Sequence, residues 1–323
     1  MKTALKLVGA LIALVLVVAL AAGGWYIYKK QPVRSGSVDL TGLTAPVTVQ
    51  YDERGVPHIR AENEVDLYKA LGYVHAQDRL FQMEIIRRLA KGELAEILGP
   101  KLLDTDKLFR TLGIRAHAQD FVAKMDMNSP SAKGLLAYLD GINQYQATHK
   151  APIEFDVLRI PKQPFTPEDS IAVTGYLAYS FAAAFTTEPV MTFIRDKLGA
   201  PYLKAFDIDW HPEGVIAPLT PDTIGKPEPV ALSDKDWAGL NHLAQVSQEA
   251  LEAAGVPRYE GSNAWAISGR RTASGKPILA GDPHIDYSAP SVWYEAHLSA
   301  PGFELYGHHQ ALAHVALLGH NTQ

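Results

Sequence analysis

The chain has 323 residues, of which 47% are hydrophobic and 20% charged, a composition typical of a globular protein and not of a disordered one. This length allows one large hydrophobic core or two smaller ones. The formal net charge of −5 argues against a nucleic-acid-binding surface, and the absence of cysteine excludes thiol catalysis, thiolate metal sites and disulfide bonds.

The N-terminus carries a long apolar segment. Residues 7–28 contain no charged residue, and basic residues flank them on both sides. About 20 apolar residues suffice to cross a bilayer as a helix, and Trp25, Tyr26 and Tyr28 lie where interfacial aromatic residues are expected. The alternative is a cleavable export signal with its cleavage site at residues 19–21. Because the apolar run continues beyond that site, we favour an uncleaved anchor; in both cases the rest of the chain is exported.

The residues after this segment predict a β-hairpin and then helices. Residues 46–60 alternate between apolar and polar side chains around a turn, which is typical of a hairpin, and we interpret His58 as a structural strand residue. Asn63, Ser129 and Thr166 are candidate helix caps, and proline follows the last two directly. They predict helices that end near residues 90, 146 and 184.

One face of the helix that begins at Thr166 is apolar. Leu177, Phe181 and Phe185 are spaced by four residues and therefore share this face. Packing in a hydrophobic core is the default interpretation of such a stripe.

A linker and a further helix precede the stretch that we consider most informative. Residues 212–229 are rich in proline and glycine, and Ser233 caps a predicted helix that ends before Gly255. The stretch 261–268 reads Gly-Ser-Asn-Ala-Trp-Ala-Ile-Ser. Its alternating small and apolar residues predict a buried or half-buried strand that begins at Ser262.

Ser262 can become a nucleophile if the preceding peptide bond is cut. A serine within a chain is a poor nucleophile, but cleavage between Gly261 and Ser262 would give it a free α-amine with a pKa near neutrality. That amine can accept the hydroxyl proton, so one residue would supply both nucleophile and base. The alternative interpretation is a loop serine before a strand.

The remaining residues predict further strands. Residues 277–280, 292–298 and 303–306 form short strand-like segments, so a β-rich part follows a mainly helical one and the fold class is α+β. Four histidines gather near the end of the sequence, at positions 308, 309, 314 and 320. Adjacent histidines on an extended segment point in opposite directions and no carboxylate pattern joins them, which disfavours a zinc site.

Several blocks of the sequence resemble the penicillin acylase family. They are Gly261–Ala266, the segment 275–284 (Gly-Lys-Pro-Ile-Leu-Ala-Gly-Asp-Pro-His), residues 52–59 and residues 71–84, and the resemblance runs from about Ala45 to the last residue. Members are N-terminal-nucleophile hydrolases that cut themselves at such a Gly–Ser bond. The resemblance implies an αββα sandwich built from the two chains, A and B, of one precursor.

The resemblance also implies a division of the chain. Residues 1–36 would be the signal peptide or anchor, 37–230 a mainly helical A-chain region, 231–261 a spacer peptide and 262–323 the start of the catalytic B chain. The oxyanion donors of the family lie farther along the B chain, so we expect them beyond Gln323, and we expect residues 1–323 alone not to turn over substrate.

The resemblance assigns roles to individual residues. Ser262 matches the nucleophile, Gly261–Ser262 the autocleavage site, and His284 a histidine near the nucleophile, with a turn residue as the alternative; Asn263 would help to fix the new terminus. Leu177, Ser180 and Phe181 match residues that line the acyl pocket. Glu188 approximates a ligand of a structural calcium ion, and no organic cofactor is expected.

The function that these observations predict is that of a penicillin acylase-like amidohydrolase precursor in the bacterial periplasm, anchored by the N-terminal helix. Its substrates would be N-acyl amides, including β-lactams with acyl side chains. The alternatives are an N-acyl-homoserine lactone acylase and a non-catalytic envelope binding protein on the same scaffold. Nucleic acid is not an expected partner.

Overall fold

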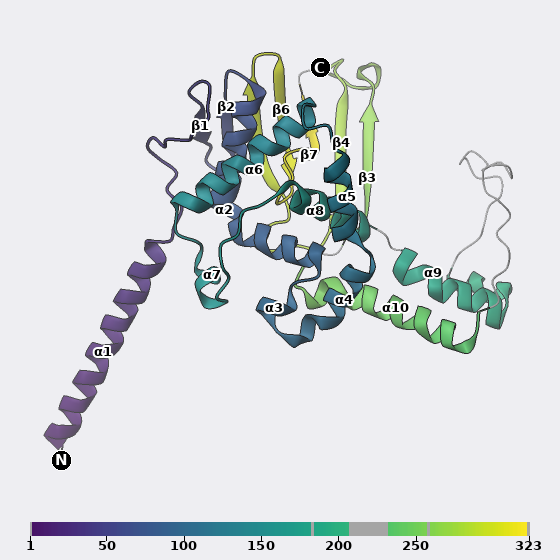
Figure 1. The fold of residues 1–323 in the computed structure, drawn as a ribbon, viewed down its shortest axis with the longest axis horizontal. Helices are drawn as coiled ribbons and strands as arrows, with labels where there is room; N and C mark the ends of the chain where they lie inside the picture. Colours follow the sequence, from purple (N-terminus) through teal and green to yellow (C-terminus); the bar gives the residue numbers. More distant parts are fainter. Residues whose placement is uncertain (1, 182–183, 207–231, 257–258, 322–323) are drawn as a thin grey trace. The chain divides into compact units, whose positions relative to one another are not determined.

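The computed structural model describes residues 2–181, 184–206, 232–256 and 259–321 (Figure 1). The chain divides into two compact units: unit 1 consists of residues 1–100, 109–176 and 287–323, and unit 2 of residues 101–108 and 177–286. The predicted mixture of helices and sheet, preceded by an apolar N-terminal helix, is confirmed.

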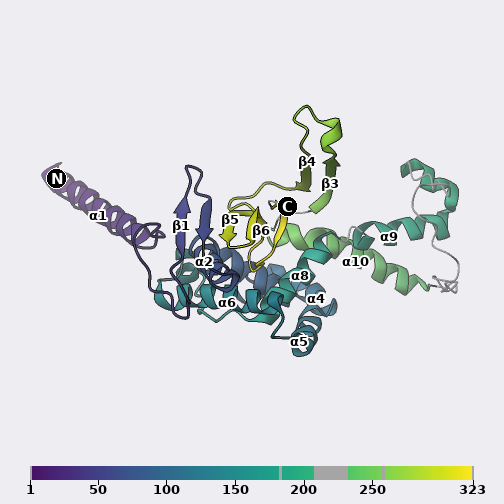
Figure 2. The same cartoon turned by 90° about the horizontal axis from the view of Figure 1, so that it is seen from above.

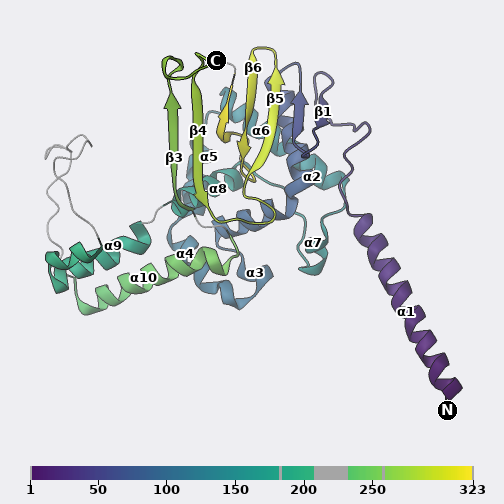
Figure 3. The same cartoon turned by 180° about the vertical axis from the view of Figure 1, so that it is seen from behind.

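Unit 1 contains a five-stranded sheet in the order β1-β2-β5-β6-β7. Its strands are β1 (Thr48–Tyr51), β2 (Pro57–Arg60), β5 (Tyr294–Ala300), β6 (Phe303–His309) and β7 (Ala316–His320). Neighbouring strands are antiparallel except β2 and β5, which are parallel. The predicted N-terminal hairpin is confirmed, and it joins the last strands of the chain in one sheet (Figure 3).

Two long helices, α2 (Glu64–Lys91) and α6 (Pro130–Thr148), pack against each other beside this sheet. A Cβ atom on Gly72 would lie 1.9 Å from the carbonyl oxygen of Tyr138, and one on Gly141 would lie 1.9 Å from that of Lys69. The two backbones therefore touch only because both positions are glycine. The caps predicted at Asn63 and Ser129 are present, because their side chains accept backbone hydrogen bonds at the helix starts.

The other helices are shorter, apart from the N-terminal helix and α10. They are α1 (Lys2–Tyr28), α3 (Ala95–Leu98), α4 (Leu103–Thr111), α5 (Ile114–Lys124), α7 (Ile153–Val157), α8 (Pro167–Ser180), α9 (Ala184–Phe193) and α10 (Asp234–Ala253). Ser233 caps α10 as predicted. The helix that we predicted to reach residue 184 ends at Ser180, and the predicted linker 212–229 lies outside the described residues.

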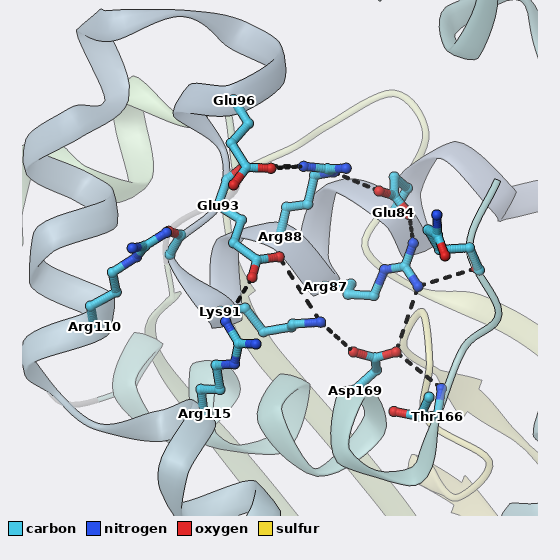
Figure 4. Close-up of polar contacts among 12 residues, drawn as sticks. Glu84, Arg87, Arg88, Lys91, Glu93, Glu96, Arg110, Arg115, Thr166 and Asp169 are labelled. Carbon is cyan, nitrogen blue, oxygen red and sulfur yellow. Dashed lines mark hydrogen bonds and ion pairs between the residues drawn. The ribbon is translucent and has the colours of Figure 1, made fainter. Parts of the chain in front are cut away.

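A network of buried charges joins α2 to the start of α8 (Figure 4). Glu84, which is fully buried, accepts hydrogen bonds from Arg87 and from Arg88, the latter at 2.6 Å. The Arg87 guanidinium lies 3.6 Å from the Asp169 carboxylate, and Lys91 donates to the same carboxylate at 3.1 Å. Because Asp169 also accepts from the backbone N–H of residue 166, the network fixes the first turn of α8 against α2.

Replacing Glu84 with glutamine should destabilise unit 1 strongly. The substitution removes the buried carboxylate that Arg87 and Arg88 share, and breaking a buried ion pair in this way costs about 3–5 kcal/mol. Urea unfolding followed by fluorescence measures the change. Lys124→Ala is the control, because its pair with Asp120 is exposed and should contribute less than about 1 kcal/mol. Equal losses from the two variants would contradict this view of the network.

Histidines are buried between the sheet and the two long helices. His75 on α2 and His309 on β6 are fully buried; the His75 ring stacks on Tyr294 at 4.2 Å and its Nδ1 lies 2.8 Å from the Tyr138 hydroxyl. Burial lowers the pKa of His309 to about 4 and lowers that of His75 well below its ordinary value. These imidazoles are therefore neutral at pH 7.

The stability of unit 1 should fall as the pH drops from about 6.5 to about 4. In this window the unfolded chain binds a proton at residue 309 that the folded chain does not, so the stability present above pH 6.5 is lost. The shift corresponds to about 3 kcal/mol. His309→Gln should therefore show a smaller loss between pH 7 and pH 4.5 in urea unfolding than the wild type. His117→Gln, on the exposed side of α5, is the control and should retain the wild-type pH dependence.

Candidate functional site

The stretch around Ser262 forms a two-stranded hairpin in unit 2 (Figure 2). Strand β3 (Tyr259–Ile267) pairs with β4 (Ile278–Ile285) in an antiparallel manner. The predicted hairpin is thus confirmed, but β4 is longer than expected and includes the Gly-Asp-Pro-His segment. Ser262 lies within β3 and not at its start, which corrects the sequence prediction.

The burial predicted for this strand is wrong. Residues 262–268 are exposed, and the Trp265 side chain keeps 52% of its surface accessible. Within the described residues β3 pairs only with β4, so the outer edge of each strand has no strand partner. The alternation of side chains specifies a strand, but burial depends on what packs against that strand.

A β-bulge precedes the Gly261–Ser262 bond. The pairing register shifts between Tyr259 and Gly261, and Gly261 has a φ of +155°, a conformation that other residues rarely adopt. A bulge changes the direction of the residues beside it. Glycine at position 261 therefore permits the bulge that directly precedes Ser262.

A polar group lies across the hairpin from this bond. In the pairing register His284 is opposite Gly261, and Asp282 is opposite Asn263. His284 Nε2 lies 3.0 Å from Asp282 Oδ2 and 3.2 Å from Asn263 Nδ2. The Nε2 atom can donate to Asp282 or accept from Asn263, and the first arrangement leaves Nδ1 unprotonated as an acceptor.

The Nδ1 atom of His284 lies close to Gly261. The Nδ1 atom of His284 is 3.8 Å from the position of a Cβ built on Gly261. Both His284 and Asp282 are about half exposed, with side-chain accessibilities of 43% and 53%. Water therefore screens the contact between the two side chains, and it contributes little to stability. Asp282 was not assigned a role from the sequence, although residues two apart on a strand lie on the same face.

The predicted acyl-pocket residues form a second group. Leu177 and Ser180 lie in the last turn of α8, where the Ser180 hydroxyl donates to the Leu177 carbonyl oxygen at 2.7 Å. Phe181 follows the helix and keeps 46% of its surface exposed, whereas Leu177 is half-buried and Ser180 buried. The exposure of Phe181 fits a surface or ligand contact better than a core position.

Glu188 lies in neither group and is exposed on α9. The described residues contain no group of three or more histidine, aspartate or glutamate side chains suited to a metal ion. A calcium site needs six or more oxygen ligands, so the calcium assignment of Glu188 stays a prediction.

The histidines near the end of the sequence are dispersed. His309 is buried, while His308 contacts the Trp293 ring and His320 stacks on Tyr306. His58, interpreted as a structural residue, pairs with the neighbouring strand, where its Nδ1 lies 2.9 Å from Nδ1 of His297.

Comparisons with known proteins identify the family. The penicillin amidase family profile matches residues 46–323. Penicillin acylase 2 proenzyme of a Pseudomonas species is 37% identical over 85% of this chain and 35% of its own length. The acyl-homoserine lactone acylase QuiP of Pseudomonas fluorescens is 31% identical over 88% of this chain and 34% of its own length.

Two further matches are penicillin G acylases. That of Escherichia coli is 26% identical over 86% of this chain and 38% of its own length. The structure of the thermostable enzyme from Alcaligenes faecalis matches with 27% identity and a TM-score of 0.43, over 57% of this chain and 98% of that one.

The chain spans about a third of the length of the curated relatives that it matches. The family profile nevertheless covers both the helical region and the hairpin of Ser262. The chain belongs to the penicillin amidase family.

Proposed function

We propose that this chain is part of an amidohydrolase precursor that cuts itself between Gly261 and Ser262 and then uses Ser262 to hydrolyse N-acyl amides. The observation that carries the proposal is the hairpin, in which a Gly–Ser bond follows a β-bulge opposite a histidine–aspartate pair. Its membership of the penicillin amidase family supports the same reaction class. The complete catalytic domain would be an αββα sandwich.

Self-cleavage begins when Ser262 Oγ attacks the carbonyl carbon of Gly261. The C–N bond breaks, the glycyl group moves to Oγ as an ester, and the nitrogen of Ser262 becomes an amine that takes up a proton. Water then hydrolyses the ester and releases the Gly261 carboxylate. A general base accepts the hydroxyl proton. We assign to His284 a positioning role beside this bond, because its Nδ1 lies near Gly261 and its Nε2 can be held by Asp282, whereas the Ser262 side chain points to the other face of the strand.

Amide hydrolysis uses the new N-terminus. The free α-amine of Ser262 accepts the hydroxyl proton while Oγ attacks the substrate carbonyl, and an acyl-serine forms as the amine product leaves. Water then hydrolyses this intermediate. The exposed position of Ser262 is compatible with access by a substrate.

The substrates would be amides with an apolar acyl group. The matched relatives are named as penicillin acylases and acyl-homoserine lactone acylases, which have the N-acyl group in common. Leu177, Ser180 and Phe181 would line the acyl pocket, and Phe181 supplies an exposed aromatic surface. We propose penicillins or related acyl amides first and acyl-homoserine lactones as the alternative.

We further propose that the protein is exported and stays attached to the inner membrane. Helix α1 is long and apolar enough over Lys6–Tyr28 to cross a bilayer, and it is exposed along this length. A cleaved signal peptide is the alternative. We also propose that Glu188 binds a structural calcium ion. The described residues contain no group of three or more acidic or histidine side chains that would complete this site.

Replacing Ser262 with alanine should leave one uncut chain in the full-length gene product, because the attacking oxygen is absent. Intact-mass analysis detects the wild-type product as a new chain that begins with Ser262. Ser268→Ala, directly after the same strand, is the matched control and should be processed normally. Normal cleavage of Ser262→Ala would contradict the mechanism, and an uncut wild type would favour the non-catalytic binding protein.

Replacing Phe181 with alanine should change acyl preference without affecting self-cleavage. The ratio of kcat/KM for an aromatic and a straight-chain acyl amide of one chromogenic amine should shift by about ten- to a hundredfold, since pocket contacts of this size discriminate substrates to that extent. Val190→Ala, an equally exposed position on α9, is the control. An unchanged ratio with reduced stability would place Phe181 in the core.

A further inference from the structure

The end of α1 is attached to α7 by specific polar contacts. The Tyr26 hydroxyl and the Lys30 ammonium both donate to the Asp156 carboxylate, and Lys30 also donates to the Ala151 carbonyl oxygen at 2.8 Å. Hydrogen bonds from Lys30 and then Tyr26 lower the pKa of Asp156, so this carboxylate stays ionised. All these residues belong to unit 1.

The residue next to this contact is apolar and exposed. Val157 keeps 73% of its surface accessible, although its neighbour Phe155 is buried. Arg159 has a φ of 55°, and the backbone N–H of Ile160 donates to the carbonyl oxygen of Phe155 at 2.8 Å, which closes the turn after α7. The turn therefore holds Val157 in an outward position.

Basic residues precede and follow this turn in the sequence and stand at the end of α1. Lys29, Lys150 and Arg159 are exposed, and Lys162 donates to two backbone carbonyl oxygens while its side chain remains at the surface. The carboxylates of the same region are Glu154, which is half-buried, and Asp156, whose negative charge is balanced by the ammonium group of Lys30. The surface around Val157 thus carries an excess of positive charge.

The position of the turn beside the end of α1 indicates what the turn contacts. Trp25, Tyr26 and Tyr28 stand at the end of the apolar helix, where interfacial aromatic residues are expected. Because Tyr26 itself contacts Asp156, the turn must lie at the depth of the lipid headgroups whenever α1 crosses the membrane. Figures 1 and 3 show α7 projecting beside the end of α1. An exposed apolar side chain at that depth, with exposed basic residues before and after it in the sequence, matches an anionic lipid surface.

We propose that the turn after α7 is a second membrane contact, in which Val157 enters the headgroup region while Lys150 and Arg159 bind lipid phosphates. This inference rests on the proposal that α1 is an uncleaved anchor, but not on the catalytic activity. The contact would hold unit 1 against the bilayer in one orientation.

Site-specific fluorescent labels test the proposal in the full-length gene product. Residues 1–323 contain no cysteine, so an introduced one reports a single position once any other cysteine of the product has been replaced by serine. Leu14→Cys reports insertion of α1, Val157→Cys reports the proposed contact, and Ala123→Cys on the exposed side of α5 is the control. Each variant carries an NBD label in vesicles of phosphatidylcholine and phosphatidylglycerol.

Lipids with a doxyl quencher should quench the labels at positions 14 and 157, and iodide should quench only the label at position 123. Replacing Lys150 and Arg159 with glutamine should lower the equilibrium constant for lipid contact at position 157 by about fivefold for each charge removed, and lipid quenching there should fall accordingly. The label at position 14 should not respond to these substitutions.

Three results would overturn the proposal. If position 14 is quenched by lipid while position 157 is as accessible to iodide as position 123, the anchor stands and the second contact does not exist. If intact mass shows that the N-terminal segment has been removed, the proposed anchor and the proposed second membrane contact are both wrong. If quenching at position 157 is independent of the two basic residues and of phosphatidylglycerol, the assignment of anionic lipid is wrong.

Discussion

The fold of unit 1 depends on the backbone contact between α2 and α6. Gly72 and Gly141 meet the backbone of the opposite helix at a separation that a Cβ atom would prevent. With α6 this close, α2 can also reach the sheet, where the Tyr294 hydroxyl donates to Asp78 at 3.0 Å and Arg79 donates to the Ser291 carbonyl oxygen at 2.6 Å. A single helix thereby holds together segments from both ends of the chain.

The charged end of α2 extends this arrangement to α8. Glu84, Arg87 and Asp169 are nearly free of water, and Arg87 also lies over the Phe165 ring at 4.1 Å. Charges in such surroundings cost free energy unless each has a partner at good geometry. The network thus tolerates few alternative positions of the first turn of α8.

Local signals in the sequence predicted local structure well. Asn63, Ser129 and Ser233 cap helices as expected, because a cap depends on residues within one turn. The parallel pairing of β2 with β5 could not be predicted, since it joins residues far apart in the sequence. The exposure of the Ser262 strand was missed for the same reason. The proximity of His284 to Asp282 was within reach, because their spacing alone places both side chains on one face of a strand.

The two proposed reactions make different structural demands. Self-cleavage requires Ser262, the Gly261 carbonyl and a base, and the register of one hairpin brings Gly261 opposite His284. The hairpin therefore positions the bond to be cut beside His284, while the side chain of Ser262, the next residue on the strand, points to the opposite face. Hydrolysis of an acyl amide additionally requires a surface that selects the acyl group, and its candidates lie on α8 and the turn after it. The proposed self-cleavage would thus depend on local pairing and the proposed substrate selection on tertiary structure, so we expect substitutions near α8 to alter the second without disturbing the first.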